Sequence, residues 1–193
     1  MIIKMPRWQS YMATTTSPLF TPEQCNDIIN AGHAEKPQAA QVGMNKPGGG
    51  LDKKKRTTTI SWIPFDKLPH MYKIVDNQLS IVNLNHFGFE NVRITEPAQF
   101  TEYPKGGFYD WHMDLDVNGQ HEPPVRKISM TCLLSDPSTF TGGDLEFLEK
   151  HKMPPLKQGQ AIFFASFLRH RVAPVKKGTR RSLVMWFGGQ PFK

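Results

Sequence analysis

Two segments of this sequence carry side chains that can bind one metal ion. In the first, His112 and Asp114 are separated by a single residue. On an extended chain, residues i and i+2 point to the same side, so this imidazole and this carboxylate can reach a common ion. A histidine and an aspartate that alternate on the surface by chance would have the same spacing. The pair alone therefore leaves both interpretations open.

The second segment supplies His170, which follows the apolar run 161–165. That run indicates a buried strand, and His170 stands where it gives way to the next predicted strand. If folding brings His170 to His112 and Asp114, the set becomes two histidines and one carboxylate. This facial triad leaves coordination positions open and is typical of non-haem Fe(II) sites that use oxygen.

A candidate carboxylate-binding residue follows ten positions after His170. Arg180 and Ser182 share one face of the strand predicted over 180–187, while Arg181 points to the other face. An arginine that faces a protein interior is costly unless an anion meets it. A planar guanidinium matches a carboxylate through two parallel hydrogen bonds, to which Ser182 can add a third. The alternative is that Arg180 lies on the surface.

The elements that must position these residues begin with two predicted helices. Residues 21–24, Thr-Pro-Glu-Gln, combine a capping threonine, a proline in the first turn and a capping-box glutamine. We expect this helix to end at Gly32 and a second helix to cover about 66–84. The β-branched and aromatic residues 57–63 predict a strand between them, and residues 1–20 are expected to be irregular.

After residue 88 the pattern changes to short strands broken by Gly, Pro and Asn. Such regular spacing is typical of an all-β sandwich, barrel or jelly roll, here preceded by helices. Trp111 and Met113 alternate with the metal-binding pair and are expected in the core. The predicted strands cover 90–95, 98–103, 126–134, 144–148, 160–164, 170–174 and 180–187.

The composition narrows the class of protein. The chain has 193 residues, of which 38% are hydrophobic and 21% charged, as in one globular domain. No stretch approaches the 18 apolar residues of a membrane-spanning helix, and the N-terminus has no signal-peptide pattern. Cys25 and Cys132 are too few for a disulfide framework or a thiolate metal site. We therefore expect a cytoplasmic protein, a monomer by default, without a membrane partner.

The net charge leaves one question about partners open. Lys and Arg number 24 and Asp and Glu 17, which gives +7. A basic surface suits acidic partners, nucleic acid included, although solubility alone is the simpler explanation. The densest basic run, Lys53–Arg56, follows Pro47–Gly50 and is expected in a flexible, solvated loop.

Taken in order along the chain, the motif residues form a recognisable series. The series resembles the Fe(II)/2-oxoglutarate-dependent dioxygenases, and within them the prolyl 4-hydroxylase-type branch, over roughly residues 21–190. The resemblance implies a mainly β fold with N-terminal supporting helices, a double-stranded β-helix or jelly roll. Residues 1–193 would form a single domain, with 1–88 as N-terminal extension and supporting helices and 89–193 as catalytic core. The series consists of Tyr103, Gly106, Tyr109, His112, Asp114, His170 and Arg180.

The resemblance also implies roles for individual residues. The catalytic metal ligands would be His112, Asp114 and His170, holding Fe(II). Arg180 would bind the distal carboxylate of 2-oxoglutarate, assisted by Ser182 and Tyr103.

Three further residues near the expected co-substrate pocket follow from the same resemblance. Trp186 would pack behind the pocket, unless it is simply part of the core, and Thr131 would face the co-substrate. The better-known prolyl hydroxylases carry a co-substrate-contacting tyrosine near the position of Leu133, which is aliphatic here. Another side chain must then replace that contact.

The implied reaction is hydroxylation of an unactivated C–H bond with consumption of 2-oxoglutarate and O2 and release of succinate and CO2. The branch points to a prolyl residue in a peptide or protein, with ascorbate as a candidate cofactor. Residues 43–56 and 115–124 flank the site opening in family members, and His121 is expected at the surface. Alternatives are the same chemistry on a free amino acid, a small metabolite or a nucleic acid, and a non-catalytic metal-binding jelly-roll module.

Overall fold

The computed structural model describes residues 10–39, 56–115, 124–148 and 155–192. Within them, the main sheet is antiparallel, with strand order β1-β11-β8-β14-β6-β4-β2 and β5 paired to β14. Its strands are β1 (Met12–Thr14), β2 (Gln38–Ala39), β4 (Thr59–Ile63), β5 (Arg93–Ile94), β6 (Ala98–Tyr103), β8 (Val125–Leu133), β11 (Ala161–Ala165) and β14 (Arg180–Gly189).

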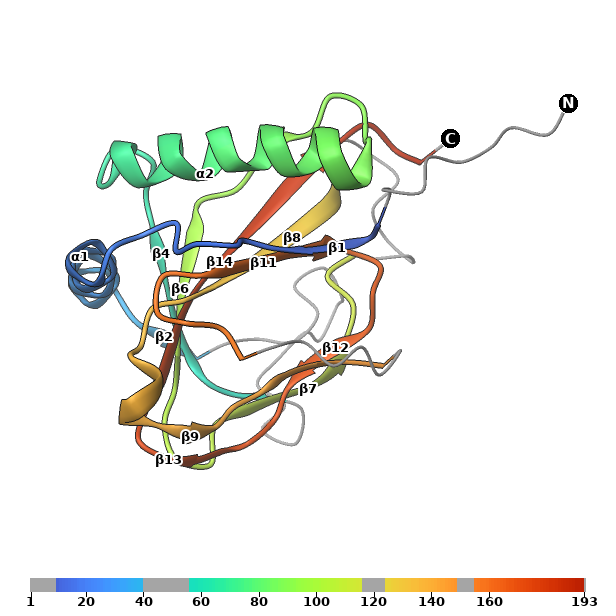
Figure 1. Ribbon diagram of the computed structural model, residues 1–193. Helices are drawn as coiled ribbons and strands as arrows, with labels where there is room; N and C mark the ends of the chain where they lie inside the picture. Colours follow the sequence, from blue (N-terminus) through green and yellow to red (C-terminus); the bar gives the residue numbers. More distant parts are fainter. Residues whose placement is uncertain (1–9, 40–55, 116–123, 149–154, 193) are drawn as a thin grey trace, which may run out of the picture.

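A smaller antiparallel sheet, of order β10-β12-β7-β3, lies across from the main sheet (Figure 1). The pair β13-β9 continues that side of the molecule. This arrangement confirms the predicted jelly roll, a mainly β fold with supporting helices. The bounds are β3 (Arg56–Thr57), β7 (Phe108–His112), β9 (Thr141–Gly142), β10 (Leu145–Phe147), β12 (His170–Val172) and β13 (Val175–Lys177).

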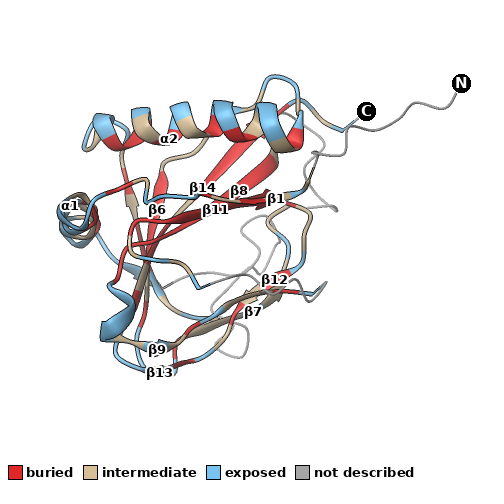
Figure 2. Ribbon diagram, viewed as in Figure 1, coloured by how far each residue is buried: buried red, intermediate tan, exposed pale blue. Residues whose placement is uncertain are grey.

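Helices α1 (Pro22–Ala34) and α2 (Pro69–Val82) pack on the face of the main sheet that points away from the smaller sheet. The buried side of α2 includes Val75 and Leu79, which join Leu183 of β14 in one apolar cluster. In Figure 2 the buried residues concentrate in the main sheet and on the inner sides of the helices. This apolar layer is the principal core of the molecule.

The first helix starts as predicted but ends later. Thr21 caps it, and the predicted capping box with Gln24 is formed. The expected end at Gly32 is wrong, because the helix continues to Ala34. A Cβ at Gly32 would lie only 2.3 Å from Cγ of Phe100 on β6. Gly32 therefore allows the helix to approach the sheet rather than terminating it.

The second helix is displaced from its predicted bounds. It begins at Pro69 rather than Asp66, since residues 65–67 form a turn. After Val82 the chain continues as a π-helical segment, Asn83–Phe87, which ends at the left-handed Gly88 with φ of 68°. None of the helices in the described residues is long and apolar enough to cross a membrane.

The strand predictions after residue 88 hold for every predicted strand, with shifted ends. The 57–63 strand is also present but is divided into β3 and β4. Several short strands escaped prediction, namely β1, β2, β7, β9 and β13. Most have two or three residues, too few for an alternating pattern to emerge, and β1 contradicts the expectation that residues 1–20 are irregular.

Candidate metal centre

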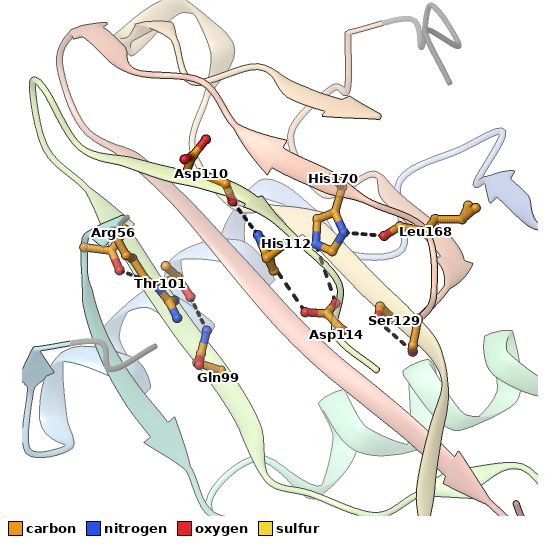
Figure 3. A network of polar contacts seen from close by, with 11 residues as sticks. Arg56, Gln99, Thr101, Asp110, His112, Asp114, Ser129, Leu168 and His170 are labelled. Atoms are coloured by element: carbon orange, nitrogen blue, oxygen red, sulfur yellow. Dashed lines mark hydrogen bonds and ion pairs between the residues drawn. The ribbon is translucent and has the colours of Figure 1, made fainter. Parts of the chain in front are cut away.

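The predicted metal-binding residues come together at one end of the two inner strands of the smaller sheet, β7 and β12. His112 ends β7 and His170 begins β12, and the register places these two residues directly opposite each other. Asp114 follows β7, and its carboxylate lies between the two rings (Figure 3). Each residue offers a ligand atom, and these atoms all lie within 4.8 Å of one another. The predicted convergence of His170 with the His112–Asp114 pair is thus confirmed.

Hydrogen bonds to the backbone orient both imidazoles. Nδ1 of His112 lies 2.7 Å from the carbonyl oxygen of Asp110, and Nδ1 of His170 lies 3.0 Å from that of Leu168. A carbonyl only accepts, so each Nδ1 carries a proton, and Nε2 is the nitrogen of each ring that faces Asp114. Both Nε2 atoms lie 3.6 Å from oxygens of Asp114. Metal-ligating histidines are commonly held by such contacts of the second ring nitrogen, so the donor set fits a divalent metal ion.

The protonation states suit metal binding. Burial, together with the nearby His170, lowers the pKa of His112 to about 3. Burial alone would raise the pKa of Asp114, but His170 and His112 hold it below its usual value. Near neutral pH the His112 ring is neutral and the carboxylate is ionised. These are the forms that coordinate metals.

Two serines that the sequence analysis missed support Asp114. The Ser129 hydroxyl helps to lower the pKa of the Asp114 carboxyl and lies 2.9 Å from the Ser166 hydroxyl. The carbonyl of Ser166 accepts from the backbone N–H groups of Asp114 and Leu115, at 3.0 and 2.9 Å. Both serines are fully buried. The alternation of polar residues along β8 was the available sequence signal.

Aromatic rings enclose the histidines. The ring of Tyr109 stacks on His112 with centroids 3.5 Å apart and an interplanar angle of 15°. The guanidinium carbon of Arg56 lies 4.3 Å from the centroid of Tyr109. Burial raises the pKa of Tyr109 to about 12, so its phenol stays neutral. The expectation that Arg56 belongs to a solvated loop is wrong, because it lies in β3; Lys53–Lys55 lie outside the described residues.

Arg180 is buried on β14, on the same face as Ser182, with 3% of its surface exposed, so the alternative of a surface position is wrong. Its Nη1 donates to the hydroxyl of Ser182 at 3.2 Å, and its guanidinium carbon lies 5.5 Å from the ring centroid of Tyr103. Burial lowers the pKa of Arg180, but a guanidinium remains protonated in proteins. No carboxylate in the described residues forms an ion pair with it.

A cavity of about 790 Å3 opens beside Arg180, between the main sheet and the segment that contains β9 and β10. Its lining includes Leu133 and Ile162 from the main sheet and Phe147 from β10. The three metal-binding residues are not part of this lining, but the ring of Phe147 lies 6.0 Å from that of His170, centroid to centroid. Arg180 thus lines the cavity directly, whereas the metal-binding residues adjoin it through the contact between Phe147 and His170.

The remaining predicted residues have mixed outcomes. Trp186 lies on the same face of β14 as Arg180 but packs between Trp62 and Arg126, with the guanidinium carbon of Arg126 3.9 Å from its ring centroid. Thr131 is buried on β8. The expectation that Trp111 and Met113 lie in the core is wrong.

Met113 is 38% exposed. Trp111 is half-buried, with the guanidinium carbon of Arg171 4.9 Å from its ring centroid. Their segment lies where β7 ends, and the rest of the protein does not cover both sides of the chain there. His121 and most of the segments 43–56 and 115–124 lie outside the described residues.

The comparisons with known proteins agree on one family. The profile of the 2OG-Fe(II) oxygenase superfamily matches residues 98–188. A PKHD-type hydroxylase of Shewanella sp. (strain ANA-3) is 31% identical over 93 residues, which cover 47% of this chain and 42% of that protein. The PKHD-type hydroxylase PiuC of Pseudomonas aeruginosa is 30% identical over 95 residues, with the same coverage of 47% and 42%. The match thus spans less than half the length of these curated relatives.

Solved structures share the fold over nearly the whole chain. The viral collagen prolyl hydroxylase of Paramecium Bursaria Chlorella virus-1, in complex with 2OG, aligns with a TM-score of 0.71 and 23% identity, covering 93% of this chain and 97% of that one. A prolyl-4-hydroxylase of Pseudomonas putida aligns with a TM-score of 0.68 and 20% identity, covering 94% of both. At these identities the likeness establishes the fold.

Proposed function

We propose that this chain, which the profile of the 2OG-Fe(II) oxygenase superfamily matches over residues 98–188, is a Fe(II)- and 2-oxoglutarate-dependent dioxygenase that hydroxylates a prolyl residue in a peptide or protein. One observation carries the proposal. Two histidines and a carboxylate converge near a cavity whose lining includes a buried arginine without a carboxylate partner in the described residues. A module that only binds metal would not need the arginine.

The metal-binding residues supply three ligands to Fe(II). His112 and His170 bind through Nε2, because their Nδ1 atoms are engaged with backbone carbonyls, and Asp114 binds through its carboxylate. The backbone N–H groups of Asp114 and Leu115, which donate to the carbonyl of Ser166, hold that segment in place, and the Ser129 hydroxyl favours the ionised carboxylate. When bound, iron and 2-oxoglutarate together supply the oxidising chemistry that hydroxylates an unactivated C–H bond and releases succinate and CO2.

The other interior residues bind and orient the co-substrate. Arg180 binds the distal carboxylate of 2-oxoglutarate through two parallel hydrogen bonds, and Ser182 orients the guanidinium through its existing contact. Tyr103, the register partner of Arg180 on β6, lines the same end of the site. Leu133 and Ile162 exclude water from the cavity wall, which strengthens these charged contacts.

The prolyl substrate rests on the family branch and on the names of the similar structures. The fold is shared with enzymes named as a viral collagen prolyl hydroxylase and a prolyl-4-hydroxylase. A free amino acid, a small metabolite or a nucleic acid would require the same iron chemistry and is distinguished by the substrate assay below. Three further predictions remain. The chain forms a single domain in which residues 1–88 support a catalytic core of residues 89–193. The protein is a cytoplasmic monomer, and it uses ascorbate.

The decisive experiment is an anaerobic titration of the protein with Fe(II) and then 2-oxoglutarate. We expect a weak visible charge-transfer band that saturates in the wild type and is absent in His112→Ala. Proline-containing peptides are then tested for stimulated succinate release and a mass gain of one oxygen. An iron-loaded, folded protein without the band would overturn the dioxygenase assignment. Stimulation by oligonucleotides or free amino acids instead of peptides would overturn the prolyl substrate.

A further inference from the structure

The cavity beside Arg180 is larger than its proposed occupant requires. Its volume of about 790 Å3 falls in the range of roughly 300–1,000 Å3 that accommodates drug-sized ligands. A five-carbon diacid fills only a small part of such a space. The remaining volume needs an explanation in terms of the residues that border it.

The extra space lies against an aliphatic wall of the main sheet. Leu133 is the register partner of Ser182, whose hydroxyl contacts Arg180. Ile162 lines the cavity from the neighbouring strand β11. Both side chains are buried, with 4% and 1% of their surface exposed. The wall beside Arg180 is therefore apolar, and it is formed by aliphatic side chains rather than by aromatic rings.

Leu133 stands near the position where the prolyl hydroxylases that this sequence resembles carry a tyrosine. A phenol ring there would project from β8 toward the guanidinium and fill part of the cavity. Leucine is shorter and has no hydroxyl. The identity of this one residue therefore influences how much room the cavity offers beside Arg180.

The polar groups of the lining are located away from this wall or are already engaged. Glu146 pairs with Arg171, with Nη2 2.7 Å from its carboxylate oxygen. Asp144 acts electrostatically on Arg180 but is itself exposed. Thr141 is likewise exposed. A ligand group next to Leu133 would meet hydrocarbon, so an apolar substituent is favoured there over a charged one.

We propose that the co-substrate pocket of this protein accepts 2-oxo diacids with small apolar substituents between the two carboxylates, and that Leu133 is the residue that permits this. The proposal rests on the proposed function, since Arg180 must bind the distal carboxylate for the substituent to reach the wall at Leu133. Ordinary 2-oxoglutarate binds in the same place and leaves the adjoining space to water.

The test compares 2-oxoglutarate with 4,4-dimethyl-2-oxoglutarate, which is achiral and carries both methyl groups next to the distal carboxylate. Each ligand is titrated anaerobically into Fe(II)-loaded protein, followed by the charge-transfer band and by calorimetry. The measured quantity is the ratio of the two dissociation constants. We expect this ratio to stay within about threefold of unity in the wild type.

The variants address Leu133 directly. In Leu133→Tyr the ratio should rise about tenfold or more, because the added ring and the methyl groups compete for one space. Leu134→Met is the matched control, since Leu134 is the next residue and belongs to the apolar core on the opposite face; its ratio should equal that of the wild type. If Leu133→Tyr does not fold, Ile162→Phe narrows the same cavity from β11 and should raise the ratio similarly.

The outcomes separate the two proposals. A wild-type protein that binds 2-oxoglutarate but discriminates tenfold or more against the dimethyl compound overturns this inference and leaves the proposed function intact. An unchanged ratio in both cavity-narrowing variants also overturns the role of this wall. Failure of both ligands to bind overturns the proposed function and the inference together.

Discussion

The two faces of β14 differ sharply in composition, although they belong to one strand. Leu183, Met185 and Phe187 point toward the helices and are completely buried in the apolar cluster. Arg180 and Ser182 point the other way and are also buried, but they are polar. One face contributes stability through removal of apolar surface from water, and the other holds groups that are costly to bury.

The polar face is made tolerable by hydrogen bonds within it. Gln99 donates to Thr101 at 2.9 Å, and Ser129 and Ser166 form a second pair. Arg180 retains donors beyond its contact with Ser182. These hydrogen bonds satisfy much of the face, although the indole N–H of Trp186 is buried without a hydrogen-bond partner in the described residues. Function and stability occupy opposite sides of the same sheet, so each can be altered separately.

The largest expected effect on the polar side is loss of the metal centre. We predict that His170→Ala abolishes iron-dependent turnover, because only two ligands remain. The folded state should persist, which circular dichroism and iron analysis of the purified variant will check. Turnover at the wild-type level would remove His170 from the metal-binding group.

The largest expected effect on the apolar side is loss of stability. Leu183→Ala should lower the free energy of unfolding by about 2–5 kcal/mol, the usual cost of truncating a fully buried leucine, as measured by denaturant titration. The folded fraction should still bind iron. Val184→Ala, a neighbour that is only half-buried on the other face, should cost less; an equal or greater cost would break the comparison.

A smaller effect is expected at the carboxylate-binding end. Arg180→Ala should weaken 2-oxoglutarate binding by roughly tenfold to several hundredfold, since charged hydrogen bonds contribute about 1.5–3 kcal/mol each. Arg181→Ala provides the control: its side chain pairs with Glu102 on the opposite face and should leave the affinity unchanged. Anaerobic titration measures both. Equal losses in the two variants would argue against a specific role for Arg180.

Removal of the Ser129 hydroxyl that supports Asp114 should have a moderate effect on the affinity for Fe(II). Ser129→Ala removes a hydroxyl that favours the ionised carboxylate, and the affinity for Fe(II) should fall about 10–100-fold, as for other groups that support metal ligands. Thr131→Ala, two residues further along the same strand face, serves as the control in a competition titration with a chelator. An unaltered affinity in Ser129→Ala would show that the backbone contacts of Asp114 suffice.

The smallest expected effect is on pH dependence. In the metal-free protein, His112 takes up a proton only near pH 3, whereas the unfolded imidazole does so near 6.5. Protons therefore favour the unfolded state between these values, and stability should fall as the pH is lowered through this window. The slope should be shallower in His112→Ala, as measured by denaturant titrations at several pH values. Identical slopes would mean that other groups determine the dependence.

Much of the fold was accessible from local patterns. The capping box at Thr21, the shared face of Arg180 and Ser182 and the core strands β6, β8, β11 and β14 depend on neighbours in sequence, so spacing alone predicted them. The boundary errors occurred where tertiary contacts override local preference. Gly32 remains helical because Phe100 packs against it.

The metal-binding residues themselves were determined by the sequence, since His112, Asp114 and His170 are recognisable by type and order. Their arrangement was decided by strand register, which places His170 opposite His112. The supporting contacts depend on the same register, as with Ser129 and Ser166, which are 37 residues apart. Side-chain patterns record which face a residue occupies, whereas pairing across strands is set by packing of the whole sheet. For that reason only the tertiary structure identified the serines, the stack of Arg56 on Tyr109 and the cavity beside Leu133.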